Sequence, residues 1–161
     1  MRVFSLQRFS HVLQFFHMKK SIPLVVGNWK LNPVTLSEAT ALASAVARRQ
    51  KVAEPYVAIA PPFPYLVEAS KKIKKSALML AAQDVHYQNL GPCTGEVSVL
   101  QLKDLGVEMV IIGHSERRAM GETDEVVLKK VQNTLKHRVR PIVCIGERVR
   151  DESGNFFNFV E

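Results

Sequence analysis

The stretch MVIIGHSERR, from Met109 to Arg118, joins the pattern of a buried strand to a turn that is rich in polar and charged residues. Its first part, Met109–Ile112, is a continuous apolar run, which is typical of a parallel strand covered on both faces. Gly113 then allows close approach of the backbone, and His114 is the one histidine at the end of an expected strand. Because parallel α/β proteins carry their functional residues at the carboxyl ends of strands, His114 is a candidate functional residue.

The same pattern repeats on both sides of this stretch. Short apolar runs alternate with amphipathic segments, which predicts a parallel α/β fold in which strands alternate with helices. The periodicity alone leaves open whether the sheet is open or closed into a barrel. Besides Met109–Ile112, the expected strands are Leu24–Val26, Tyr56–Ala60, Ala77–Ala82 and Pro141–Ile145.

Capping and turn residues indicate where the helices begin and end. Thr35 followed by Glu38 is a capping-box signature. Pro64 and Thr123 are expected to open two further helices, and Gly106 to end a short one. The expected apolar faces consist of Ala39, Leu42, Ala43 and Val46; Leu66, Ala69 and Ile73; Val99, Leu102 and Leu105; and Val127, Val131 and Leu135.

A second strand end that carries polar and charged residues is GNWKLN, residues 27–32, after the first expected strand. The ammonium group of Lys30 and the amide of Asn28 suit an anionic, oxygen-rich small molecule. At the other end, Ser115 is expected to cap a turn whose backbone amides point at His114 and favour a neutral imidazole, which can donate a hydrogen bond. Each motif alone is also typical of a surface lysine or of a histidine that bonds only backbone.

Taken together and in order, these motifs resemble the triosephosphate isomerase family. GNWKLN and IIGHSERR are signatures of that family, and APPFPYL (60–66), AAQDVHYQNLGPCTGEVS (81–98) and PIVCIGER (141–148) agree with it. The resemblance runs from about Pro23 to the end of the sequence. It implies a TIM (β/α)₈ barrel, here incomplete, because a whole barrel takes about 250 residues and only about five β/α units can be counted. The partial barrel domain is expected to span residues 18–161.

The resemblance also implies an activity and residue roles. The family interconverts dihydroxyacetone phosphate and D-glyceraldehyde 3-phosphate through an enediolate, without metal or organic cofactor, and it is itself a standard worked example of a glutamate base paired with a neutral histidine. By resemblance, His114 is the catalytic electrophile and Lys30 provides positive charge to the substrate. Glu116 pairs with Lys30, and Asn28, Trp29 and Ser115 lie at the substrate.

The region Gln83 to Glu96 resembles the loop that the family inserts into a partner subunit. This implies a homodimer in which Gln83 and Thr94 make dimer contacts. Cys144 and Glu147 match structural positions near the fifth strand.

One part of the family pattern has no counterpart in these 161 residues. The family's base is a Glu in a YEPVWAIGTG-like stretch after the sixth strand, and glycine-rich segments after the seventh and eighth strands hold the phosphate. Glu161 lies in the register of the fifth helix and is not expected to serve as the base. The sequence therefore resembles an N-terminal fragment, which we predict to be inactive and poorly folded by itself, since its sheet edges and apolar interior would be uncovered.

Composition narrows the class of protein. Hydrophobic residues make up 47% and no apolar run is long enough to span a membrane. Four of the seven net positive charges lie in residues 1–20, and the dense run between Lys71 and Lys75 is expected at a helix end, so a nucleic-acid partner is disfavoured. The two cysteines, Cys93 and Cys144, are not spaced as a metal site, and reduced thiols predict a cytoplasmic protein.

Residues 1–17 lack acidic side chains and are set apart as an N-terminal extension. Translation from a start upstream of Met18 or an organellar presequence would both give such a segment. Two other function classes stay open at this point: a catalytically silent phosphate-sugar-binding protein of the same fold, and a basic nucleic-acid-binding module.

Overall fold

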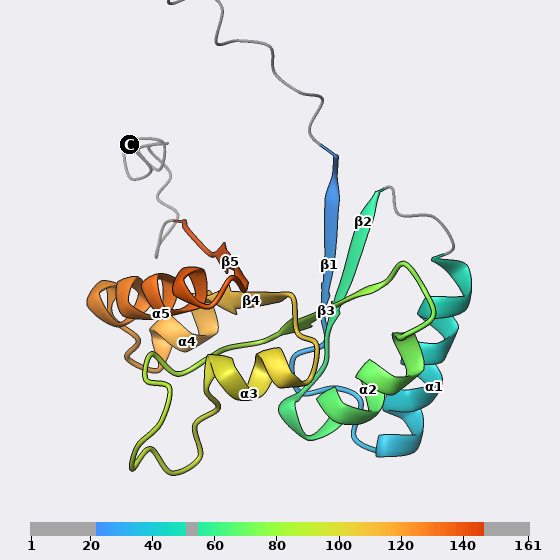
Figure 1. Ribbon diagram of the computed structural model, residues 1–161, viewed down its shortest axis with the longest axis horizontal. Helices are drawn as coiled ribbons and strands as arrows, with labels where there is room; N and C mark the ends of the chain where they lie inside the picture. Colours follow the sequence, from blue (N-terminus) through green and yellow to red (C-terminus); the bar gives the residue numbers. More distant parts are fainter. Residues whose placement is uncertain (1–21, 51–54, 147–161) are drawn as a thin grey trace, which may run out of the picture.

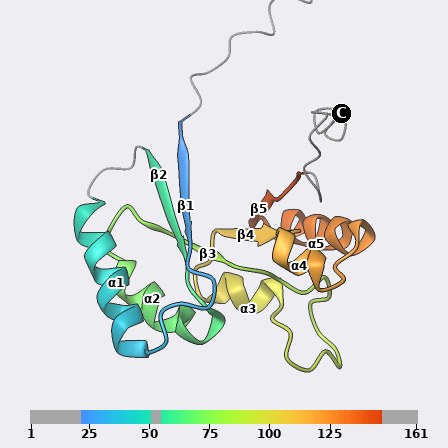
Figure 2. The ribbon, with the colours of Figure 1, turned by 180° about the vertical axis from the view of Figure 1, so that it is seen from behind.

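The fold is built on five parallel strands in the order β1-β2-β3-β4-β5, seen in a computed structural model that describes residues 22–50 and 55–146. Figures 1 and 2 show that the strands curl into half a barrel with the helices along its outer side. This confirms the predicted incomplete TIM barrel of alternating strands and helices. The elements are β1 (Leu24–Asn28), α1 (Leu36–Arg49), β2 (Tyr56–Ala60), the 3₁₀ turn η3 (Phe63–Tyr65), α2 (Leu66–Ile73), β3 (Met79–Ala82), α3 (Val99–Asp104), β4 (Met109–Ile112), α4 (Ser115–Ala119), α5 (Asp124–Lys136) and β5 (Arg140–Val143).

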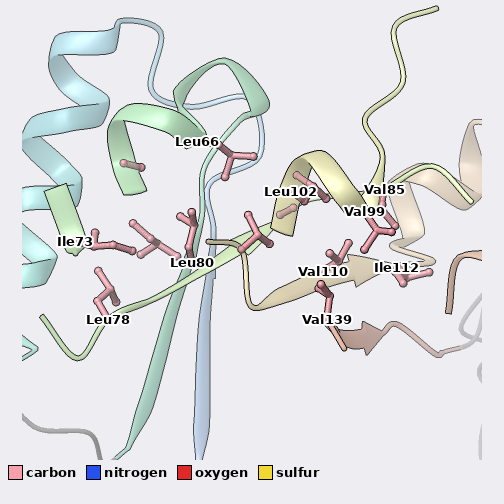
Figure 3. Packing of buried hydrophobic residues seen from close by; sticks show 14 of the residues in the cluster. Leu66, Ile73, Leu78, Leu80, Val85, Val99, Leu102, Val110, Ile112 and Val139 are labelled. Carbon is pink, nitrogen blue, oxygen red and sulfur yellow. The ribbon is translucent and has the colours of Figure 1, made fainter. Parts of the chain in front are cut away.

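Alternate residues of the strands face two apolar clusters. Ile59, Leu80 and Val110 point outward and pack with the helices, as Figure 3 shows for Leu80 and Val110 beside Leu66 and Leu102. The inner face holds a smaller cluster that includes Met109. A strand buried on both faces needs apolar residues at every position, and this explains the continuous runs in the sequence.

Three predicted strands differ from the observed ones at their ends, and the strand expected at Pro141–Ile145 is β5 at Arg140–Val143. β1 continues through Gly27 and Asn28, which pair in register with Ile59 and Ala60 of β2. The strand expected at Ala77–Ala82 begins only at Met79. In all three places pairing with a neighbouring strand sets the boundary, because a polar or small residue can continue a strand when its backbone finds a partner.

The helix starts agree with the capping residues. Thr35 and Glu38 form the predicted capping box of α1, and Thr123 caps α5. Pro64 lies in η3 rather than in the first turn of α2, which begins at Leu66. Gly106 follows the end of α3 with a φ of +81°, a left-handed conformation that glycine adopts readily.

Two expected core positions are wrong. Leu135 of α5 is 58% exposed and Leu42 of α1 is 42% exposed. In α5 the buried residues are Val127, Lys130 and Thr134, which follow the i, i+3, i+7 spacing of a helix face. A strict four-residue repeat drifts about 40° per step around a helix with 3.6 residues per turn, so Leu135 has rotated away from the sheet.

Both outer strands of the sheet keep one side unpaired among the described residues. β1 pairs only with β2, and β5 only with β4. Val25 in β1 and Val143 in β5 are exposed apolar residues. An unpaired strand with apolar side chains is a template for association with another chain, which is the physical basis for the predicted aggregation. That expectation stays a prediction.

Candidate active site

The loop after β1 holds Lys30 in a fixed backbone conformation. Lys30 has a positive φ of 55°, which costs a non-glycine residue about 1 kcal/mol or more. Its amide donates to Oδ1 of Asn28 at 3.0 Å, and its carbonyl accepts a hydrogen bond from Nε2 of Gln83 at 2.9 Å. Nε2 of Gln83 also donates to the carbonyl of Ala60 at 2.8 Å. Residues that follow three different strands therefore combine to hold this strained loop at the carboxyl end of the sheet.

The turn after β4 depends on Gly113. This glycine has a φ of +73°, and a Cβ there would lie 3.1 Å from Nη2 of Arg118 and 3.2 Å from Cγ2 of Val127. Nε of Arg118 donates to the Gly113 carbonyl at 2.8 Å. The absent side chain thus lets α4 and α5 pack closely against the end of β4, and His114 comes next in the chain.

His114 itself caps α4, which corrects the prediction that Ser115 would do so. Nδ1 of His114 accepts a hydrogen bond from the amide of Glu116 at 3.2 Å, and Ser115 is an exposed residue in the first helical position. The strand ends so close to the helix that the cap falls on the first residue after Gly113. The expected geometry is nevertheless present, because the backbone amide of Glu116 points at Nδ1 of His114.

This cap decides which nitrogen of His114 can carry a proton. A nitrogen that accepts an N–H bond has no proton of its own, so the neutral ring carries its proton on Nε2. Nδ1 also lies 3.6 Å from Oε2 of Glu116. We take the amide as its partner, since 3.6 Å is too long for a hydrogen bond. The side chain of His114 can therefore donate from Nε2.

Lys30 and Glu116 come together across the end of the sheet, as the resemblance implied. Nζ of Lys30 lies 2.6 Å from Oε1 of Glu116, and both side chains are more than half exposed. The hydrogen bond from Lys30 is the largest cause that lowers the pKa of Glu116 below its ordinary value of 4.5. The carboxylate of Glu116 therefore stays ionised in mildly acidic solution, with Lys30 and His114 on either side of it.

We expect the pKa of Glu116 to rise towards 4.5 when Lys30 is replaced by Met. A lowered pKa means that the ion pair is intact above the ordinary value and is lost as the pH falls through the lowered one. Carbon-detected NMR titration of the Glu116 carboxyl group measures this directly. Glu68, which pairs with Lys71 on α2, serves as the unaffected control. The same midpoint for Glu116 in both proteins would contradict the assignment.

A cleft of about 340 Å³ opens at this end of the sheet. Its size falls within the usual range for small-molecule sites. Five predicted site residues line it, namely Asn28, Lys30, Gln83, His114 and Glu116. Leu31, Phe63, Asp84, Arg117 and Met120 complete the lining.

Three predicted site residues lie elsewhere. Trp29 packs against the outer apolar cluster, Ser115 is exposed on α4, and Thr94 is exposed in the loop between β3 and α3. The family resemblance implied that Trp29 and Ser115 lie at the substrate, and the lining of this cleft does not include them. Neighbours along a turn project in different directions, so adjacency in the sequence does not bring both side chains into one cleft.

Sequence reasoning missed a buried ion cluster beside the cleft. Asp84 accepts from Nη2 of Arg117 at 2.8 Å and from Nζ of Lys130 at 2.7 Å, and Lys130 also bonds Glu122. Nε of Arg117 and Oε2 of Glu122 are buried and have no hydrogen-bond partner among the described residues. The cluster ties the end of β3 to α4 and α5, so it holds the segment that carries His114. The one feature of the sequence that pointed to this cluster was Lys130 on the apolar face of α5. Its role can be inferred only when the fold places Asp84 beside it.

Replacing Lys130 by Met is expected to lower the free energy of unfolding by about 3–5 kcal/mol, because the buried carboxylate of Glu122 loses its cation and that of Asp84 keeps only Arg117. Lys130 is only 3% exposed, whereas its neighbour Lys129 is exposed, with its ammonium group 5.4 Å from the centre of the Tyr87 ring. Lys129→Met should therefore cost less than about 1 kcal/mol. Urea unfolding of the two variants makes the comparison. Equal losses of stability would show that the ion cluster does not hold the fold.

Comparison with known proteins covers the two loops that carry the candidate site, after β1 and after β4. A sequence profile described as triosephosphate isomerase matches residues 23–161. The chain belongs to the triosephosphate isomerase family. The profile covers both GNWKLN and IIGHSERR, so the geometry at the ends of β1 and β4 lies inside the matched region.

Similar proteins carry the same family name. A triosephosphate isomerase of Thermoanaerobacter pseudethanolicus is 45% identical over 140 residues, which cover 86% of this chain and 56% of that protein. A triosephosphate isomerase of Alkaliphilus oremlandii is 42% identical, with 83% and 54% covered, and one of Treponema pallidum is 43% identical, with 84% and 55% covered. The chain thus spans about 56% of the length of the first of these relatives.

The loop that resembles the dimer loop of triosephosphate isomerases stands away from the sheet. Figures 1 and 2 show the connection from β3 to α3 extending beside α3. Its base is fixed to α5, because Nδ2 of Asn133 donates to Oδ1 of Asn89, and Asn89 in turn contacts Nε2 of His137 at 3.1 Å. The dimer contacts of Gln83 and Thr94 stay predictions, and the amide of Gln83 is already bonded within its own chain.

The remaining expectations concern cysteines, metals and membranes. Cys93 and Cys144 are both free thiols, and burial raises the pKa of Cys144, which packs on the inner face of the sheet. Glu147 lies outside the described residues. Within 22–50 and 55–146, no group of three or more His, Cys, Asp and Glu could hold a metal ion. In the same residues, no helix has the length and apolar character of a membrane span.

Proposed function

We propose that these residues supply half of the active site of a triosephosphate isomerase, which interconverts dihydroxyacetone phosphate and D-glyceraldehyde 3-phosphate. The observation that carries the proposal is the convergence of Lys30, Glu116 and His114 on one cleft, with the contact of 2.6 Å between Lys30 and Glu116. Profile and relatives support the same activity. The reaction moves a proton between neighbouring carbons of a phosphorylated triose, so its catalyst needs an electrophile, a base and positive charge.

His114 fits the role of electrophile. Its Nδ1 is occupied by the Glu116 amide at 3.2 Å, so Nε2 presents the N–H. A neutral N–H donor polarises a carbonyl and stabilises the charge that develops on its oxygen. It can also pass its proton to that oxygen and recover one from the neighbouring hydroxyl, which returns the imidazole to its starting state. No organic cofactor or metal is needed for these steps.

Lys30 fits the role of the substrate-binding cation. Its ammonium group is about half exposed at the cleft and shares its charge with a single carboxylate, Glu116. A phosphate dianion entering the cleft therefore meets an ammonium that is already positioned, which lowers the entropy cost of binding. Asn28 holds the loop and lines the cleft beside Lys30, and we retain Trp29 and Ser115 as weaker proposals for substrate contact.

The base is proposed to come from outside these residues. The sequence contains no YEPVWAIGTG-like stretch, and Glu161 lies outside the described residues. A positioned base contributes about 10²–10⁴ to a rate. Residues 18–161 would then act as the part of the barrel that binds and polarises the substrate, with residues 1–17 as an extension.

The assembly is proposed to be a cytoplasmic homodimer, held through the loop from Gln83 to Glu96, with neither nucleic acid nor membrane as a partner. No observation favours the alternative of a catalytically silent sugar-phosphate-binding protein. The test is isomerase activity of a joined polypeptide, in which residues 23–161 are followed by the part of the Thermoanaerobacter pseudethanolicus relative beyond its match. A folded joined polypeptide without activity would reject the proposal.

A further inference from the structure

A second cleft lies at the opposite end of the sheet from the candidate active site. Its volume is about 500 Å³, and it lies where the last turns of α1 and α2 meet the segment that leads into β3. Figure 1 shows the two helices side by side, with that segment passing the end of α1. Ser76 and Ala77, which line the cleft, precede β3, whereas Lys30 and His114 follow the ends of β1 and β4. The two clefts are therefore separate.

Small side chains form the walls of this cleft, and positively charged side chains lie around them. Ser44, Ala47 and Ala77 leave space between the helices, and Arg48, Lys72 and Lys75 are the charged residues that line it. All three cations are exposed. Among the described residues that line the cleft there is no aspartate or glutamate. Three positive charges thus face one hollow that has no carboxylate among its described lining residues.

The helix ends account for only part of this charge. Each helix carboxyl end carries about half a negative charge, so the two ends together offset roughly one of the three cations. Lys71, just outside the cleft, is paired with Glu68 at 2.6 Å. No ion pair is recorded for Arg48, Lys72 or Lys75 with any described residue. About two positive charges are therefore left to attract an anion.

We propose that this cleft binds a chain of phosphate groups, as in inorganic triphosphate or the phosphate part of a larger molecule. Such an anion carries three or more negative charges close together, which three converging cations can contact at once. The guanidinium group of Arg48 can bind two phosphate oxygens in parallel. No aromatic side chain lines the cleft among the described residues, so there is no surface on which a nucleobase could stack. The chemistry recognised is that of the phosphates.

Isothermal titration of the joined polypeptide, which contains the whole cleft, with inorganic triphosphate at an ionic strength of about 0.1 M tests the proposal. The triple variant Arg48→Gln, Lys72→Gln, Lys75→Gln should bind about tenfold more weakly, since each exposed ion contact contributes modestly. A matched variant removes the same charge elsewhere through Lys129→Gln, Lys136→Gln and Arg140→Gln, which are all exposed. Its affinity should stay within about twofold of the unaltered chain, because charges more than about 10 Å away are screened.

Backbone NMR signals of residues that line the cleft test whether the triphosphate binds there. Backbone NMR signals of Ala47 and Ala77 should shift on titration of the unaltered chain and not in the cleft variant. Lys30→Met should leave triphosphate binding unchanged, so a failure of the proposed isomerase function would not affect this result. Equal weakening in the matched variant, or loss of binding with Lys30→Met, would overturn the proposal. Binding of duplex DNA that triphosphate does not displace would also overturn the proposal, because the cations of the cleft would then form a nucleic-acid-binding surface.

Discussion

The joined polypeptide is expected to isomerise dihydroxyacetone phosphate at least about 10⁴-fold faster than residues 1–161 alone. These residues bring His114 and Lys30 to one cleft, but their sequence has no counterpart of the family's base or of its phosphate-binding segments. The added segment would supply a positioned base, backbone amides for the phosphate and a lid that excludes water. It would also pair with the open edges of β1 and β5.

Formation of glyceraldehyde 3-phosphate measures this difference, with all proteins purified from a host that lacks its own isomerase. The added segment by itself is the control and should also be inactive, because it carries neither Lys30 nor His114. Enzyme-like turnover by residues 1–161 alone would show that a group within them acts as the base. Circular dichroism and gel filtration of residues 1–161 would test the accompanying prediction that this polypeptide folds poorly and aggregates.

His114→Asn in the joined polypeptide is expected to lower kcat by about 10²–10⁴ with little change in KM. The exchange removes the Nε2 donor, which acts on the charge that develops during the reaction. Asn is among the best residues for starting a helix, so its side-chain oxygen can still accept from the Glu116 amide that Nδ1 of His114 now accepts at 3.2 Å. The melting temperature should therefore change little while turnover collapses.

A matched exchange of the capping residue distinguishes chemistry from helix capping. Thr35 caps α1 and does not line the cleft, with its side chain accepting from the amide of Glu38. Thr35→Asn should leave both kcat and stability close to those of the unaltered protein. If His114→Asn kept kcat within about tenfold in a folded protein, His114 would not be the electrophile, and the site would have to be assigned anew.

Several site contacts followed from the sequence because they depend on strand ends alone. Lys30 follows β1 and His114 follows β4, and the carboxyl ends of parallel strands lie at one edge of a sheet. That rule alone predicts that both residues lie in one region of the fold. The contact between Lys30 and Glu116 came from the resemblance, and the structure confirms it at 2.6 Å.

Other features of the site could not be read in this way. Asp84 and Lys130 are 46 positions apart, and neither is distinctive alone. The positive φ of Lys30 depends on Gln83, which reaches across from the end of β3. The cap of α4 fell on His114 rather than Ser115, because the distance between a strand end and the next helix is set by packing around Gly113.

By itself, the sequence determined the alternation of strands and helices, the capping of α1 and α5 and the edge of the sheet where function lies. These depend on interactions between residues close along the chain, namely apolar period, side-chain caps and turn residues, which are written locally. Only the tertiary structure decided that Leu42 and Leu135 lie off the buried helix faces, how Asp84 neutralises Lys130 and which cations gather between α1 and α2. Those properties depend on pairs far apart in sequence, whose contact exists only once the sheet has brought their elements together.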